Sequence, residues 1–155
     1  MTDRSQLTSR QHHMPEITLD SADGRAIVQR PGRALLALCI HDWACTSCNT
    51  EVAHIVKVAD EIAAWGCDVA LIVCAQPSPA PYSLPPAFRV FFDPDDEFAQ
   101  VSGSASPGVV IADEWADITF RRAAGANHEF PDTSRLLSEI RYLATRCPEC
   151  EGEAL

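Results

Sequence analysis

The sequence has little positive charge. Its 155 residues include 12 Lys and Arg against 22 Asp and Glu, and Lys57 is the only lysine, so the formal net charge is −10. A surface that binds phosphate groups needs clustered Lys and Arg. The composition therefore argues against a nucleic-acid partner and against binding to an anionic membrane.

Long apolar runs are also missing. No stretch reaches the roughly 20 apolar residues of a membrane-spanning helix, and the polar start MTDRSQLTSRQHHMPE lacks the apolar segment of a secretion signal. We therefore expect a cytoplasmic protein with no membrane partner. The length suits one domain with a core of its own, and 46% hydrophobic with 22% charged residues is typical of globular proteins.

Cysteine, in contrast, is frequent. Four of the seven cysteines form two Cys-x-x-Cys pairs, Cys45 with Cys48 in ACTSC and Cys147 with Cys150 in CPEC. In a reducing cytosol, paired cysteines indicate metal binding or redox chemistry rather than a disulfide scaffold. At this point three interpretations are open: one zinc site with four ligands, one redox centre with an unrelated pair, or two redox centres.

The order of the expected elements indicates an α/β fold. Continuous apolar runs at 34–41 and 68–75 predict buried strands, and apolar residues at helical spacing between them predict a helix that ends at Gly66. We expect a disordered tail over 1–14, one domain over 15–146 and a CPEC tail over 147–155. The remaining elements are an N-terminal hairpin turning at Asp23-Gly24, a proline-rich loop over 76–86, a strand at 88–93, a short helix at 94–103, a hairpin over 108–123 and an amphipathic helix over 132–145.

The first cysteine pair falls where a strand gives way to a helix. Backbone N–H groups in the first helical turn, together with the helix dipole, stabilise a thiolate on Cys45. Cys48 lies one turn further on, close enough to attack a mixed disulfide formed by Cys45. A charged His41 could add to the stabilisation, although an exposed histidine without a role explains it equally well.

Two segments resemble thioredoxin-like proteins, and within them the redoxin and peroxiredoxin-like (AhpC/TSA-type) branch. MPEITLDSADGRAIVQRPGRALLALCIHDWACTSCNTEV is similar to the opening of that branch, and FFDPDDEFAQVSGSASPGVVIADEWADI to its second half. The resemblance covers roughly residues 14–146. It implies a thioredoxin-like α/β fold, with a mixed central β-sheet, flanking helices and an N-terminal β-hairpin.

The resemblance also implies roles for individual residues. Cys45 would be the attacking thiol and Cys48 the resolving one. Pro107 matches the cis-proline of the family, so we expect a cis Ser106–Pro107 bond that presents backbone to a substrate beside Trp43. Cys39 stands where thioredoxins carry a buried acid; it could join a local thiol network, but a small apolar strand residue is the simpler interpretation.

These observations favour a thiol–disulfide oxidoreductase that acts on a protein or small-molecule thiol or disulfide. A peroxiredoxin-type antioxidant peroxidase is the first alternative. It fits less well because Cys45 occupies the threonine position of that family when Cys48 is aligned with the peroxidatic cysteine. A zinc-binding or interaction module is the second alternative. We expect no cofactor and no metal at the first cysteine pair.

The second pair remains a separate question. The last helix of a thioredoxin-like sheet runs away from the active site, so Cys147 and Cys150 should lie at the opposite pole from Cys45. A zinc ion shared by the two pairs of one chain is therefore not expected. A zinc ion shared by two tails in a homodimer, and a second dithiol that reaches another molecule, both remain open.

Overall fold

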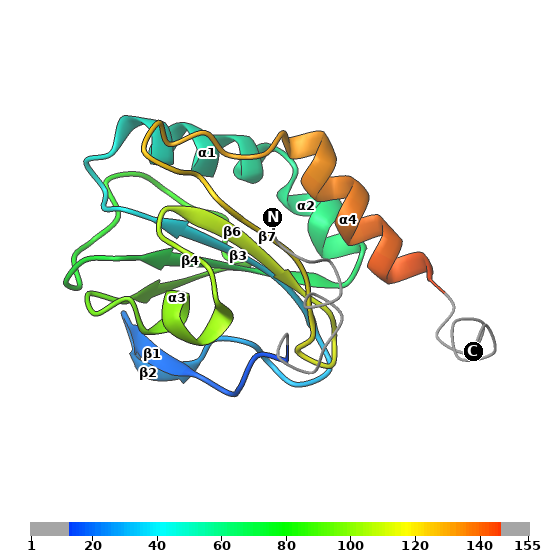
Figure 1. The fold of residues 1–155 in the computed structure, drawn as a ribbon. Helices are drawn as coiled ribbons and strands as arrows, with labels where there is room; N and C mark the ends of the chain where they lie inside the picture. The colour runs from blue at the N-terminus through cyan, green and yellow to red at the C-terminus, as the bar shows by residue number, and fades with distance from the viewer. Residues whose placement is uncertain (1–12, 147–155) are drawn as a thin grey trace.

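The computed structural model describes residues 13–146, which form a mixed seven-stranded sheet with helices on both faces (Figure 1). The strand order is β2-β1-β5-β4-β3-β6-β7. Strands β3, β4 and β5 are parallel, whereas β1–β2 and β6–β7 are antiparallel pairs. The strands are β1 Thr18–Ser21, β2 Gly24–Ile27, β3 Ala34–Ile40, β4 Cys67–Val73, β5 Phe88–Phe92, β6 Gly108–Ala112 and β7 Ile118–Ala123; the helices are α1 Thr46–Lys57, α2 Ala59–Ala64, α3 Glu97–Ser102 and α4 Thr133–Thr145.

The central strand β3 is buried on both faces, as its continuous apolar sequence predicts. Helices α1, α2 and α4 cover one face and α3 covers the other (Figure 1). Alternate side chains of β3 divide between two core clusters. Leu36, Leu38 and Ile40 pack with Cys48 of α1, whereas Leu35, Ala37 and Cys39 pack with Phe98 of α3.

The helix expected after the first cysteine pair is divided in two. Helix α1 ends and α2 begins at Val58, whose backbone dihedral angles are not helical. Both halves keep their apolar residues on the same core cluster, Val52 and Ile55 from α1 and Ala59 and Ile62 from α2. No glycine or proline marks the break, so the spacing of apolar residues predicted a single helix.

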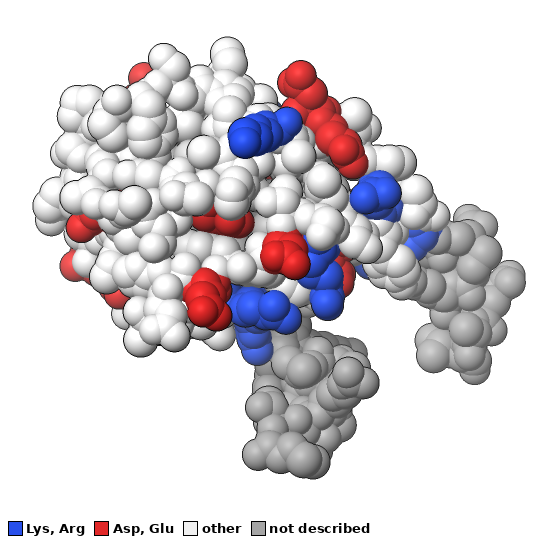
Figure 2. All heavy atoms as spheres, turned by 90° about the horizontal axis from the view of Figure 1, so that it is seen from above, with Lys and Arg blue, Asp and Glu red and all other residues white. Residues whose placement is uncertain are grey.

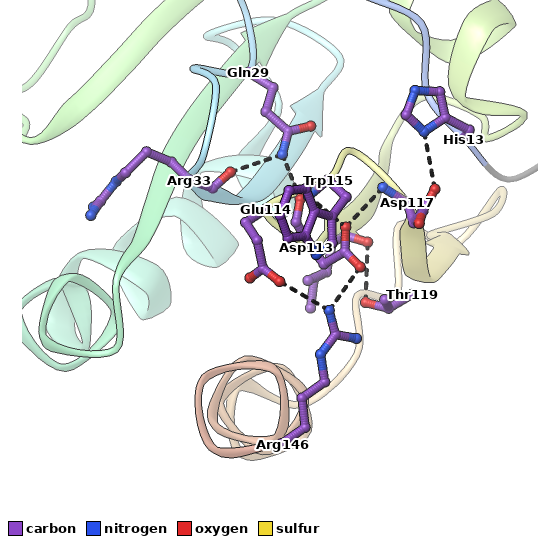
Figure 3. A network of polar contacts seen from close by, with 10 residues as sticks. His13, Gln29, Arg33, Asp113, Glu114, Trp115, Asp117, Thr119 and Arg146 are labelled. Carbon is purple, nitrogen blue, oxygen red and sulfur yellow. Dashed lines mark hydrogen bonds and ion pairs between the residues drawn. The ribbon is translucent and has the colours of Figure 1, made fainter. Parts of the chain in front are cut away.

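A polar network holds the end of the sheet opposite to the start of β6 (Figure 3). Asp113, which directly follows β6, accepts hydrogen bonds from the backbone N–H groups of Trp115 and Asp117. Its second oxygen lies 2.9 Å from a guanidinium nitrogen of Arg146, directly after α4. The described chain therefore ends at the far end of β6 from Pro107, as the resemblance implied. Cys147 and Cys150 lie outside the described residues.

The domain begins earlier than the expected boundary at residue 15. His13 forms a bridge and an ion pair with Asp117, and Met14 is only 2% exposed in the core. The sequence around these residues is polar, and the contact that buries Met14 comes from far along the chain. Its backbone N–H donates to the carbonyl of Ala116. Among residues 13–146, no helix is long and apolar enough to cross a membrane.

The start of β6 has no room for a side chain. A Cβ atom at Gly108 would lie 2.6 Å from the carbonyl oxygen of Ala105 and 2.8 Å from that of Arg122. Both are backbone atoms, so the strand pair itself would have to move. We expect Gly108→Ala to lower the free energy of unfolding by about 1–3 kcal/mol, measured by urea denaturation. An unchanged midpoint would contradict this close packing.

Candidate active site

Cys45 lies at the junction between β3 and α1, where the sequence predicts it. A tight turn follows β3, in which Asp42 accepts a hydrogen bond from the backbone of Ala44 at 2.8 Å. Cys45 is the N-terminal capping residue of α1, and its Sγ accepts a hydrogen bond from the backbone N–H of Cys48 at 3.4 Å. Its side chain is half-buried, so the sulfur combines a stabilising backbone donor with access from solvent.

Cys48 differs from Cys45 in burial. It is fully buried in the core under α1, and its Sγ accepts a weak hydrogen bond from the backbone N–H of His41 at 3.5 Å. Burial first, and then the hydrogen bond with Cys45, raise the pKa of Cys48 to about 12. At neutral pH Cys48 is therefore a protonated thiol beside the more accessible Cys45.

His128 joins the site from a distant part of the chain. It lies in the loop between β7 and α4, and its Nδ1 is 3.4 Å from Sγ of Cys45. Its ring stands edge-on to His41, with 5.3 Å between the ring centroids. The sequence analysis missed His128 because GANHEF carries no recognisable pattern and 83 residues separate it from Cys45.

Trp43 packs between the cysteine turn and the proline-rich loop. Its indole N–H donates to the carbonyl of Ser78 at 3.3 Å, and its ring stands edge-on to Tyr82. The Tyr82 hydroxyl in turn donates to Asn49 on α1, at 2.8 Å. The proline-rich loop therefore packs against Trp43, two residues before Cys45.

The Ser106–Pro107 peptide bond is cis, as the resemblance implied. Pro107 directly precedes β6, and Gly108 pairs with Cys39 near the end of β3. Pro107 is therefore at the same edge of the sheet as the turn that leads to Cys45. The Ser106 hydroxyl lies 2.8 Å from Sγ of Cys74, the residue after β4.

Cys39 does not belong to the Cys45–Cys48 pair. Its side chain faces the α3 side of the sheet, whereas Cys48 lies in the core cluster on the α1 side. The thiols and hydroxyl near it are those of Cys74 and Ser106, and burial raises its pKa well above the usual range. The structure thus favours the simpler interpretation of Cys39 as a small buried strand residue.

A cavity of about 390 Å³ lies beside His128. Viewed from the helix side, charged side chains gather toward the half of the molecule where α4 ends, and the half where α1 begins shows few of them (Figure 2). The cavity is lined by Ser47, Thr50, Glu51, His54, His128, Phe130, Pro131, Asp132 and Thr133.

The two thiols should react very differently with an alkylating reagent. In the reduced protein at pH 7 we expect iodoacetamide to modify Cys45 and leave Cys48 almost untouched. Because the pKa of Cys48 is raised to about 12, its reactivity should rise tenfold for each pH step of one unit over the alkaline range in which the fold persists. Peptide mapping after timed alkylation measures both rates. Equal labelling of Cys45 and Cys48 at pH 7 would contradict the expected difference in reactivity between the two thiols.

Comparison with known proteins supports the fold. No family model matches the chain, and no curated protein is significantly similar in sequence. Among solved structures, a candidate thioredoxin from Neisseria meningitidis is 21% identical, with a TM-score of 0.70 over 93% of this chain and 97% of the other. AhpC from Mycobacterium tuberculosis is 18% identical, with a TM-score of 0.66 over 89% and 95% of the two chains.

A peroxiredoxin-like protein from Aquifex aeolicus is 14% identical, with a TM-score of 0.63 over 84% of this chain and 85% of the other. The matches span nearly the whole of both molecules, so they concern the complete arrangement of sheet and helices. The chain therefore has the thioredoxin-like fold that its sequence predicts, and both thioredoxin-like and peroxiredoxin-like proteins share it.

Proposed function

We propose that the protein is a thiol–disulfide oxidoreductase that uses the Cys45–Cys48 dithiol. The observation that carries the proposal is the contrast between two adjacent thiols. Cys45 is accessible and accepts a backbone hydrogen bond at the start of α1, whereas Cys48 is buried and protonated. Such a pair separates the attacking thiol from the resolving thiol.

In the first step the thiolate of Cys45 attacks one sulfur of a substrate disulfide. A bond forms between Cys45 and that sulfur, the substrate S–S bond breaks, and the other substrate sulfur leaves as a thiolate that takes up a proton. Cys48 then loses its proton and attacks Sγ of Cys45. The products are the Cys45–Cys48 disulfide and a second substrate thiol, so two electrons have passed to the substrate.

His128 supports the proton movements of these steps. Its Nδ1, 3.4 Å from Sγ of Cys45, is within reach to accept the thiol proton before attack and to return a proton to the leaving sulfur. The substrate class is a protein or small-molecule disulfide, and the cytoplasm remains our expected location. Trp43 and the backbone around Ser106 and Pro107 form the edge on which such a substrate would bind.

An activity measurement on the full chain tests the proposal. We expect the protein, supplied with dithiothreitol, to accelerate the reduction of insulin disulfides above the rate given by dithiothreitol alone. No acceleration with insulin or with oxidised glutathione would contradict it.

The second candidate is a peroxidase, which the structural similarity to AhpC favours. In that reaction a cysteine thiolate attacks one oxygen of hydrogen peroxide, the O–O bond breaks, and a sulfenic acid forms while the leaving hydroxide takes up a proton to give water. Rapid peroxide consumption with sulfenic acid trapped on Cys45 or Cys48 would support the peroxidase over the oxidoreductase.

A further inference from the structure

Three metal-binding side chains meet at the outer edge of the candidate active site. They are His41 from the end of β3, Cys45 from the start of α1 and His128 from the loop before α4. One potential ligand atom from each lies within 4.8 Å of the other two. We propose that these residues form a binding site for a single zinc ion when Cys45 is reduced.

The distances suit tetrahedral zinc. With Zn–S near 2.3 Å and Zn–N near 2.0 Å, two ligands of a tetrahedral ion lie roughly 3.5 Å apart. Sγ of Cys45 and Nδ1 of His128 are already 3.4 Å apart. His41 is exposed, so its ring can rotate the remaining distance without disturbing the core.

The chemistry of the three groups also suits zinc. Cysteine thiolate and imidazole are both zinc ligands, and three protein ligands leave the fourth position for water or substrate. Cys45 and His128 are half-buried and His41 is exposed, so an ion can enter from solvent. Cys48 is fully buried beneath the cluster and is not one of its ligands.

A second group of potential ligands, Cys74, Asp93 and Asp96, is less suitable. Both carboxylate oxygens of Asp93 accept hydrogen bonds from backbone N–H groups at the start of α3, at 2.8 and 2.9 Å. The Cys74 sulfur is close to the Ser106 hydroxyl. Asp93 already caps the start of α3 with both of its oxygens, whereas His41, Cys45 and His128 are each accessible from solvent.

The zinc site departs from the expectation that the first cysteine pair holds no metal. That expectation came from the sequence, in which the pair falls at a strand-to-helix junction typical of a redox centre and His128 is far from Cys45. The proposed zinc site also makes metal binding depend on the redox state of Cys45. Oxidation by a small disulfide consumes the zinc-bound Cys45 thiolate, the Cys48 thiol and one proton, and yields the Cys45–Cys48 disulfide, two small thiols and free zinc.

The test uses the full chain with Cys147→Ser and Cys150→Ser, so that the C-terminal pair cannot bind the ion. Co²⁺ is titrated into the reduced protein under anaerobic conditions, and the thiolate-to-cobalt absorption band is followed while Zn²⁺ competes. We expect one ion per chain. Cys45→Ser should abolish the band, and His41→Asn or His128→Asn should each weaken binding by more than the roughly 10- to 100-fold that the loss of a supporting residue costs.

Two variants serve as controls. Cys48→Ser should keep the band, because Cys48 is not a ligand, and His13→Asn, at the opposite end of the sheet, should bind as tightly as the parent. Oxidised glutathione should release the ion from the parent, and reduction of the protein followed by removal of the reductant should restore binding. A band that survives in Cys45→Ser, or that is unaffected by both histidine changes, would overturn the site.

The outcome is independent of the oxidoreductase proposal. Cobalt and zinc binding are measured without any disulfide substrate, and insulin reduction is measured in the presence of a chelator. Metal binding without insulin reduction would support the zinc site and contradict the proposed function. Insulin reduction by a protein that binds no metal would support the proposed function and contradict the zinc site.

Discussion

Replacing Cys45 with serine is expected to lower the rate of insulin reduction by roughly a thousandfold or more, as the loss of a nucleophile does in other enzymes. Serine keeps the hydroxyl that can accept the hydrogen bond from the backbone of Cys48, so the start of α1 should stay intact. The measurement is turnover with excess reductant, accompanied by thermal denaturation to show that the fold is unchanged.

The variant Cys48→Ser distinguishes the resolving thiol from the attacking thiol, Cys45. Without the resolving thiol, the first step should still occur and the protein should accumulate as a mixed disulfide on Cys45, visible by mass spectrometry. Cys74→Ser is the matched control, because this half-buried cysteine lies outside the pair and serine can keep the contact with Ser106. Full activity in Cys45→Ser would contradict the assignment of the attacking thiol.

The second large effect is expected at His128. Acid–base groups contribute about 10²–10⁴-fold to enzymatic rates, and His128 is the side chain whose ring nitrogen lies 3.4 Å from Cys45. We therefore expect His128→Asn to lower turnover by about a hundredfold. Asparagine tolerates the positive φ of 52° at this position, so the loop should keep its course.

Two readouts distinguish a proton-transfer role from a merely structural one. The rate at which iodoacetamide modifies Cys45 at neutral pH should fall together with turnover, while the thermal midpoint stays close to that of the parent. His13→Asn, a surface change at the far end of the sheet, should alter neither rate. If His128→Asn turns over as fast as the parent, the histidine has no part in the proton movements.

The sequence could predict the fold because each element has a local signal. The apolar runs of β3 and β4 and the amphipathic pattern of α4 each depend on burial on one or both faces. The break between α1 and α2 at Val58 and the burial of Met14 could not be predicted in this way. Both arise from packing against residues distant in the chain.

In the candidate site, too, some features have a local sequence signal and others depend on residues distant in the chain. Cys45 and Cys48 carry a sequence motif, and the strand before them and the helix after them fix their positions. The placement of Cys39 on the opposite face follows from the alternation of side chains along β3. The contact between Cys45 and His128 depends instead on how β7 returns to the edge where β3 ends. A single sequence holds no sign of that contact, although the chemistry we propose relies on it.

Reversible formation of the Cys45–Cys48 disulfide is the most direct test of the central claim. The full chain is equilibrated with oxidised glutathione, remaining thiols are blocked at low pH, and disulfide-linked peptides are mapped by mass spectrometry before and after treatment with dithiothreitol. We predict a Cys45–Cys48 link that dithiothreitol removes, with Cys39 and Cys67 unmodified in the core. A folded protein in which Cys45 and Cys48 remain unlinked under these conditions would contradict the account.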